Sequence, residues 1–160
     1  MSYAFWKVAH IVSASILFGT GLGIAFYCWF GYRAAMRSGE IAALRATLRL
    51  TVIADALFTA PAVLFQAASG AVLMHRLGFS FASPWSAAVW ALFVFTGACW
   101  LPVVWLQLRQ WREANDAVSV AALSDAFHRR FRIWFALGVP AFAAVLAIYW
   151  LMVAKPFAVG

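Results

Sequence analysis

The chain has 160 residues, of which 66% are hydrophobic and only 11% are charged. A soluble domain is usually about half apolar and about one quarter charged, so this composition excludes an ordinary soluble domain and indicates a protein surrounded by lipid. The formal net charge of +7 does not indicate nucleic-acid binding, because the charges lie between apolar runs and form no basic helical face beside a soluble core.

Four long apolar runs follow one another along the chain, and none contains Lys or Arg: residues 8–30, 50–73, 85–106 and 133–153. Each is close to the ~20 residues that cross ~30 Å of hydrocarbon as a helix. Backbone polar groups in lipid must bond within their own segment, so each run is predicted to be helical. We expect an all-α integral membrane four-helix bundle with antiparallel spans, forming a single domain over residues 1–160.

The three connections differ in composition. Residues 31–49 are rich in arginine, and much of this stretch is predicted to continue the helices past the membrane. Residues 74–84 contain Gly, Ser and Pro, which is typical of a turn. Residues 107–132 form the longest polar stretch, in which Ser124 and Asp125 indicate the start of the last helix.

The basic residues predict the orientation of the spans. Only Lys7, Arg76 and Lys155 lie on the side of the first and last residues. The first and third connections hold nine arginines, namely Arg33, Arg37, Arg45, Arg49, Arg109, Arg112, Arg129, Arg130 and Arg132. Short loops rich in Lys and Arg stay in the cytoplasm, so both termini of this multi-pass protein are predicted to lie outside it, which is the periplasm if the cell is a Gram-negative bacterium.

A polar stripe is predicted on the second span. At ~100° per residue, four positions share one narrow sector of the helix: Asp55, Thr59, Gln66 and Gly70. Such a stripe faces the interior of a bundle, because polar groups in lipid are costly. Two interpretations of Asp55 stay open: an ion pair with a boundary arginine, such as Arg132 or Arg33, or a proton relay.

Two further features concern helix shape and packing. Pro61 lies in the middle of the second span and predicts a kink, since proline lacks the N–H that the helix needs. In the first span, Gly19-x-x-x-Gly23 is a spacing that permits close approach of another helix.

Chemically distinctive residues gather at the end of the bundle that carries the termini: Lys7, His10, Met74, His75, Met152 and Lys155. Imidazole and thioether groups are axial ligands of haem iron, and boundary lysines can pair with the haem propionates. Four-helix bundles build cofactor sites between facing helices, so the set predicts a b-type haem site with His10 as its ligand. His75 is about 160° from the polar stripe on an ideal helix, whereas His128 belongs to the opposite end.

The chain resembles a bacterial family of predicted integral membrane proteins of unknown function over nearly its whole length. The resemblance is carried by motifs in order along the chain, including Lys7-x-x-His10, Ala54-Asp55, Phe58-Thr59-x-Pro61-Ala62, the run at residues 97–107, and Phe131-Arg132-Ile133-Trp134-Phe135.

The two ends of the chain are also similar to HemJ-type protoporphyrinogen oxidases, which are four-span proteins that bind b-type haem. Tyr3-x-x-Trp6-Lys7-x-x-His10 and Lys155-Pro156-Phe157 carry this similarity. It implies that His10 is a haem-linked histidine and Lys7 a functional lysine. The third span here has neither the Lys nor the His of that family, so the similarity implies a haem site without implying the oxidase activity.

Three functions are therefore predicted as alternatives, and the sequence assigns no enzyme activity. The first is an inner-membrane protein that binds haem b at its outer end and has a redox or haem-related role. The second is an accessory or assembly subunit, either as a homo-oligomer or within a larger membrane complex. The third is a small transporter that uses Asp55 and Gln66.

Overall fold

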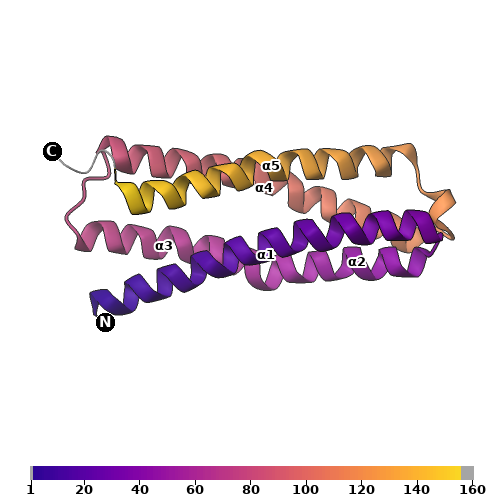
Figure 1. Ribbon diagram of the computed structural model, residues 1–160, viewed down its shortest axis with the longest axis horizontal. Helices are drawn as coiled ribbons and strands as arrows, with labels where there is room; N and C mark the ends of the chain where they lie inside the picture. The colour runs from indigo at the N-terminus through magenta and orange to yellow at the C-terminus, as the bar shows by residue number, and fades with distance from the viewer. Residues whose placement is uncertain (1, 156–160) are drawn as a thin grey trace.

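The computed structural model describes residues 2–155, and within them every regular element is a helix. The order is α1 (Tyr3–Ser38), α2 (Ile41–Ala54), the π-helical turn η1 (Asp55–Thr59), α3 (Ala60–Arg76), α4 (Pro84–Asp116), the short 3₁₀ helix η2 (Val120–Ala122) and α5 (Asp125–Ala154). Because α2, η1 and α3 form one rod, four long rods run antiparallel (Figure 1). This confirms the predicted all-α four-helix bundle.

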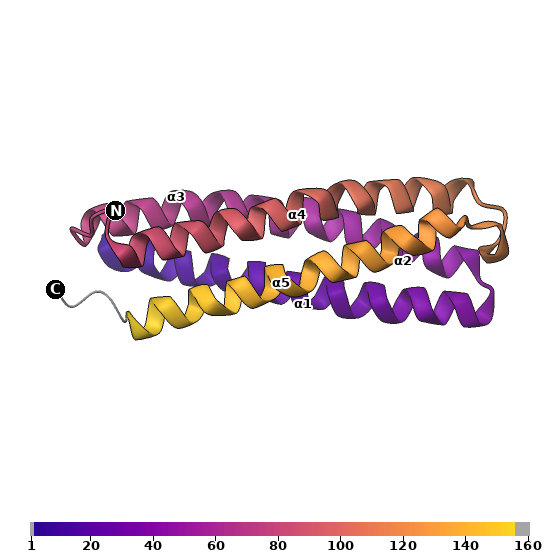
Figure 2. The ribbon, with the colours of Figure 1, turned by 90° about the horizontal axis from the view of Figure 1, so that it is seen from above.

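The two ends of the bundle differ in what they carry. The start of α1, the α3–α4 connection and the end of α5 lie together, and we call this the terminal end (Figures 1 and 2). The α1–α2 and α4–α5 connections lie at the other end, which we call the arginine end after the nine arginines on the adjoining parts of the four helices. The side of the membrane that each end faces stays a prediction.

The outer surface of the bundle is apolar. All four rods are long and apolar enough to cross a membrane, and only 11–28% of the residues in their most apolar windows are buried inside the protein. Large side chains such as Phe26, Leu64 and Leu101 are more than 60% exposed. A soluble monomer rarely exposes so large an apolar patch, so this surface faces lipid.

The rods are longer than the spans predicted within them. At about 1.5 Å per residue, the 36 residues of α1 measure roughly 54 Å, well beyond ~30 Å of hydrocarbon. The excess lies at the arginine end, as expected for residues 31–49. There the rods enclose the larger apolar core of the protein, which includes Leu44, Leu48, Phe127 and Phe131.

Polar contacts close the arginine end. Gly39 ends α1 with φ 76°, a left-handed conformation that favours glycine. Arg45 donates from Nε to the Ala114 carbonyl at 2.9 Å and from Nη2 to the Ala117 carbonyl at 2.7 Å, which satisfies the last turn of α4. Ser124 begins α5 by accepting the Phe127 N–H at 3.1 Å, as its position predicts.

An ion pair joins the end of α4 to the start of α5. Arg130 and Glu113 are its partners, and it is the one ion pair found among residues 2–155. Glu113 also accepts from the hydroxyl of Ser124 at 2.5 Å. The carboxylate thereby fixes the connection and the first turn of α5 together.

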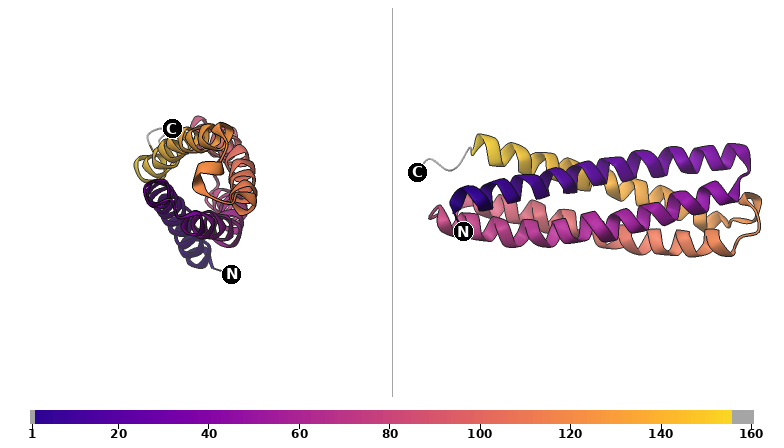
Figure 3. Two further views of the ribbon diagram at one scale, coloured as in Figure 1. Left: turned by 90° about the vertical axis from the view of Figure 1, so that its right-hand side faces the viewer. Right: turned by 90° about the horizontal axis from the view of Figure 1, so that it is seen from below.

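The rods are associated in two groups that part toward the terminal end. α4 packs along α5, while α1 packs along α2 and α3; the groups meet mainly through α2 and α4, and α1 touches α5 more sparsely. α3 makes few contacts with α4 or α5. Figure 3 shows the rods arranged around the long axis of the bundle. The terminal half is therefore the looser half.

Proline 61 is accommodated by a π turn. The Ala60 N–H bonds to the Asp55 carbonyl, five residues back, immediately before the proline. Pro61 has no N–H to give to the helix, and the wider turn absorbs that loss. The interruption places Asp55 and Thr59, both buried, at the two ends of η1.

The glycine spacing in α1 does not do what was predicted. A Cβ added at Gly19 or Gly23 would meet no atom within 4 Å, so neither glycine packs against another helix of this chain. The close approach is at Gly31 instead, where an added Cβ would lie 2.6 Å from Oγ1 of Thr47. Glycine is needed where α1 meets α2, because that is where the rods are tightly packed.

This contrast yields a test of packing. Gly31→Ala is expected to lower stability by about 1–3 kcal/mol through overpacking against Thr47, which is buried and stiff. Gly19→Ala is expected to leave stability unchanged or raise it by up to about 1 kcal/mol, since alanine favours a helix. Thermal unfolding in detergent, followed by circular dichroism, measures both, and Thr47→Ala should partly rescue Gly31→Ala. Equal melting temperatures for the two glycine variants would contradict the packing described.

The orientation is testable with single cysteines. His75 and Arg37 are exposed at opposite ends, whereas the native Cys28 and Cys99 are buried. A membrane-impermeant maleimide added to intact spheroplasts is expected to label His75→Cys at once and Arg37→Cys only after permeabilisation. The reverse pattern would show that the termini face the cytoplasm.

Candidate functional site: two adjoining cavities

A cavity of about 520 Å³ lies between the rods at the terminal end, and we call it the terminal cavity. Pockets for small ligands and cofactors usually measure about 300–1,000 Å³. All four rods contribute to its lining, which includes Lys7, His10, Gln66, Gly70, Met74, Trp90, Tyr149, Met152 and Lys155. The parting of the two helix groups creates this space.

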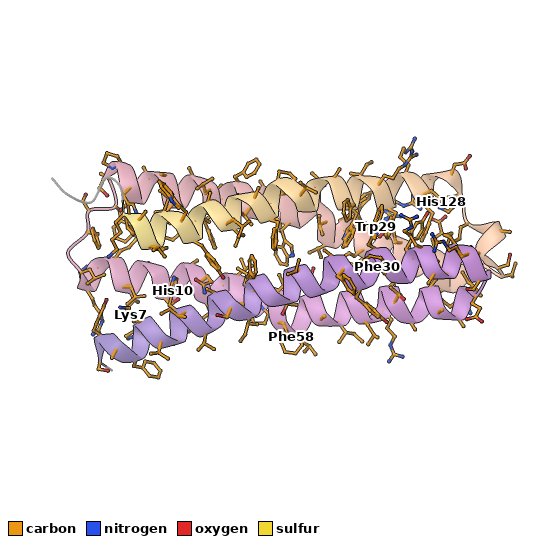
Figure 4. The ribbon with its side chains drawn as sticks, viewed as in Figure 1. Lys7, His10, Trp29, Phe30, Phe58 and His128 are labelled. Atoms are coloured by element: carbon orange, nitrogen blue, oxygen red, sulfur yellow. The ribbon has the colours of Figure 1, made fainter. Side chains whose placement is uncertain are left out.

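His10 is held against α3 by two hydrogen bonds. Its Nδ1 lies 2.7 Å from the Ser69 hydroxyl, and its main-chain carbonyl accepts from Nε2 of Gln66 at 2.7 Å. Its Cε1 rests on Gly70, where an added Cβ would approach it to 3.4 Å. Figure 4 shows Lys7 and His10 on α1 at the terminal end. The polar stripe of the second span thus meets His10.

The Ser69 hydroxyl decides which imidazole nitrogen carries hydrogen. Its oxygen lies 2.6 Å from the Phe65 carbonyl, which has no hydrogen of its own, so Ser69 donates there. The same oxygen must then accept from His10, and Nδ1 is the protonated nitrogen. Nε2 is left with its lone pair on a side chain that lines the cavity. Histidines that bind metals have this arrangement, with one ring N–H anchored and the other nitrogen free.

Two lysines lie at the mouth of the terminal cavity. The ammonium of Lys7 lies 6.0 Å from the centre of the Tyr3 ring, and that of Lys155 lies 5.5 Å from the Phe79 ring. Both side chains are exposed, and neither forms an ion pair with another residue in the described range. The mouth therefore carries two positive charges that are free to meet an anionic group.

The predicted cluster is only partly assembled. Met74, which is buried, and Met152 line the cavity beside His10. His75 is exposed on the last turn of α3 and does not line the cavity, in line with its direction on an ideal helix. His128 lies at the arginine end, as predicted, where its Nδ1 is 2.7 Å from the Tyr32 hydroxyl (Figure 4). The structure brings His10 and the methionines together and leaves both other histidines outside.

A second cavity of about 380 Å³ continues deeper into the bundle, and we call it the inner cavity. The two cavities share part of their lining, including Gln66 and Tyr149. The Tyr149 hydroxyl donates to the Ala14 carbonyl at 2.7 Å, which ties α5 to α1 at this junction. At its far end the inner cavity reaches Asp55 and Thr59 of η1.

Asp55 is buried within a network of neutral side chains. Trp100 Nε1 donates to Oδ1 at 3.3 Å. With the Gln107 amide oriented to satisfy its neighbours, its nitrogen donates to Oδ2 at 3.0 Å and its oxygen accepts from Trp134 Nε1 at 3.1 Å. Of the two interpretations of Asp55, the ion pair with Arg132 or Arg33 is wrong for residues 2–155, and the proton relay stays a prediction. The arginines serve the arginine end, where Arg45 meets carbonyls and Arg130 meets Glu113.

Several residues around His10 and Asp55 were not predicted from the sequence. Ser69 contacts His10, Gln107 and the indole nitrogen of Trp100 contact Asp55, and the indole nitrogen of Trp134 donates to Gln107. Trp90 lines the terminal cavity, and its buried Nε1 has no acceptor among residues 2–155. Ser69 follows the stripe residue Gln66 by three positions and was within reach of a helical pattern. The roles of the tryptophans could not be predicted in this way, because tryptophan also commonly anchors spans at the membrane interface.

Comparisons with known proteins agree with the membrane fold. The family described as "Predicted integral membrane protein (DUF2269)" matches residues 4–156. No curated protein matches the chain, and no solved structure matches it. The resemblance to a family of predicted integral membrane proteins is confirmed, and the similarity to HemJ-type oxidases stays a hypothesis.

Two glutamines of α4 allow a matched test of the Asp55 network. Gln107→Leu removes a donor from Asp55 and an acceptor from Trp134, and each buried group left unpaired costs about 1–3 kcal/mol. Gln110 is fully buried, yet its amide has no partner in residues 2–155, so Gln110→Leu is expected to be neutral or stabilising. Thermal unfolding in one detergent compares the two variants. A larger loss for Gln110→Leu than for Gln107→Leu would contradict the network.

Proposed function

The chain belongs to the DUF2269 family of predicted integral membrane proteins, and we propose that it binds b-type haem in the terminal cavity, with His10 as an axial ligand. The observation that supports this most directly is the state of the imidazole. Ser69 holds Nδ1 at 2.7 Å and leaves Nε2 available on the cavity wall. A ligand histidine needs this second contact, because it fixes both the tautomer and the orientation of the ring.

The remaining wall of the cavity fits the same group. Haem is a flat apolar macrocycle with an anionic edge, and the cavity has apolar and aromatic sides with Lys7 and Lys155 at its mouth. These lysines would pair with the propionates. The unpaired indole N–H of Trp90 offers one more donor for a bound ligand. Met74 and Met152 are the candidates for a second ligand inside the cavity, and thioether sulfur is a known haem ligand.

The chemistry that haem supplies is one-electron transfer at its iron. The protein would contribute a dry setting between helices, an oriented imidazole and positive charge at the mouth. If the predicted orientation is right, the site opens on the outer side of the membrane. A site that includes His75 stays a prediction, and so do the accessory-subunit and transporter alternatives; the proposal depends on His10.

The test is a visible spectrum of the detergent-purified protein, reduced minus oxidised, after expression with an ample supply of haem. A Soret band with b-type features is expected for the wild type. His10→Ala should abolish it, whereas His128→Ala, a histidine at the arginine end, should keep it. A wild-type protein without a Soret band under these conditions would disprove the proposal.

Further variants separate the ligands from their supports. Ser69→Ala removes the acceptor of Nδ1, so haem affinity is expected to fall by about tenfold or more, as for other outer-shell partners of metal ligands. Met74→Leu should change the spectrum if this sulfur binds iron, and Met152→Leu is its counterpart on α5. His75→Ala is expected to leave the spectrum unchanged, because His75 lies outside the cavity. Unaltered haem affinity in the Ser69→Ala protein would contradict the inference that Ser69 fixes the tautomer of His10 for haem binding.

A further inference from the structure

The inner cavity ends at a carboxylate without a counter-charge. Both oxygens of Asp55 accept hydrogen bonds from N–H groups, those of Trp100 and Gln107, which can only donate. Such bonds favour the ionised form of the acid, whereas burial away from water favours the neutral form. No basic side chain among residues 2–155 pairs with it. An ionised carboxylate at membrane depth without a cation is costly, so a cation from outside the chain would complete the site.

A second acceptor lies beside Asp55 on the wall of the same cavity. Thr59, at the other end of η1, is 94% buried and lines the same cavity, and its hydroxyl accepts no hydrogen bond from the described part of the chain. The π turn places both acceptors against the inner cavity. A primary ammonium carries three N–H donors, so it can bond to the carboxylate and to the hydroxyl at once.

Most of the remaining lining of the inner cavity is apolar and aromatic. Phe18 on α1 stacks on Phe142 of α5 with ring centres 4.7 Å apart, and Phe93 and Trp100 of α4 line the same space. Aromatic faces attract cations when the site is desolvated, and they also accommodate an apolar tail. These walls favour an organic cation over a small hydrated ion, because aromatic and aliphatic side chains offer such an ion no oxygen ligands.

The cavity reaches the lipid-facing surface between α1 and α5. Leu22 is 50% exposed and Val139 58% exposed on the outer surface, yet both also line the inner cavity. Gly21 and Gly138 lie beside them, and a Cβ at either would meet nothing within 4 Å. These two rods touch only sparsely, which leaves this seam thinly covered. A ligand dissolved in the bilayer can thus reach the cavity sideways.

We propose that the inner cavity binds a lipophilic primary amine from the bilayer, with its ammonium on Asp55 and Thr59 and its apolar part among the aromatic side chains. This site is separate from the haem site, although the two cavities adjoin at Gln66. A single ligand of this kind would account for the buried carboxylate, the Thr59 hydroxyl and the opening to lipid.

Binding to the protein in phosphatidylcholine nanodiscs tests the proposal, with empty nanodiscs as the blank. Radiolabelled dodecylamine is expected to bind saturably, while 1-dodecanol should show no binding above the blank, and dodecyltrimethylammonium should bind at least tenfold more weakly. Asp55→Asn should weaken dodecylamine binding at least tenfold, and Thr59→Val should weaken it severalfold. Asp116→Asn, an exposed carboxylate at the end of α4, is the matched control and should change nothing.

A second pair of variants leaves Asp55 untouched and so guards against misfolding. Gly138→Leu fills the seam and should reduce dodecylamine binding, whereas Gly23→Leu, on the exposed surface of α1 away from the cavity, should not. Dodecylamine binding that is equal in the wild type, Asp55→Asn and Gly138→Leu would overturn the proposal. Saturable, Asp55-dependent binding of dodecanol would overturn it as well, since the site would then recognise a neutral donor. His10→Ala should lose haem without losing the amine.

Discussion

A polar group inside hydrocarbon must find its partner within the protein, and the position of α3 depends on this requirement. Together with η1 it forms a rod whose buried polar side chains lie along one side: Asp55 and Thr59 of η1, then Gln66 and Ser69 of α3. Gln66 and Ser69 form hydrogen bonds with His10 on α1, and Asp55 accepts a hydrogen bond from α4. Rotating the rod would expose these groups to lipid, at a cost of several kcal/mol for each unsatisfied group. The hydrogen bonds of the stripe thereby fix how the rod that contains α3 is rotated relative to α1 and α4.

The bundle is dense at one end and hollow at the other, and the surrounding solvent explains the difference. The rods extend past the hydrocarbon at the arginine end, where water drives apolar side chains together into the core that contains Leu44 and Phe127. Lipid tails are as apolar as leucine, so no such force closes the terminal half. Association there depends on a smaller apolar cluster that contains Met74, Trp85 and Leu151, and on specific contacts such as that of Tyr149 with the Ala14 carbonyl. The space between the contacts forms the two cavities.

The two cavities lie in the same gap between the rods, but their linings differ in chemistry. The terminal cavity presents an oriented imidazole, two thioethers and two lysines, which together suit a haem. The inner cavity presents a carboxylate and a hydroxyl within an aromatic wall, which suits an amine with an apolar tail. Gln66 belongs to both linings and bonds to the main chain of His10, so it forms part of the boundary between the two sites. Neither site needs the arginines, which close the opposite end through Arg45 and Arg130.

Features that depend on one helix could be predicted from single stretches of the chain. The four spans, the helical continuation past residue 30, the cap at Ser124 and the buried stripe all follow from local composition and helical period. The placement of His10 at the terminal end follows as well, because antiparallel spans alternate in direction. The direction of His75, away from the stripe, was also visible in the period.

What depended on two helices at once could not be predicted in this way. The spacing Gly19-x-x-x-Gly23 allows close packing, but only the tertiary structure decides that α1 meets its neighbour at Gly31 instead. Asp55 had arginines within plausible reach, but the rods place neutral indole and amide donors beside it. Amino-acid sequence by itself determined that this protein is a four-span membrane bundle with polar groups turned inward. The tertiary structure alone decided which partners those groups have, because a partner is set by how rods cross and part, and residues far apart in the chain carry no local record of that geometry.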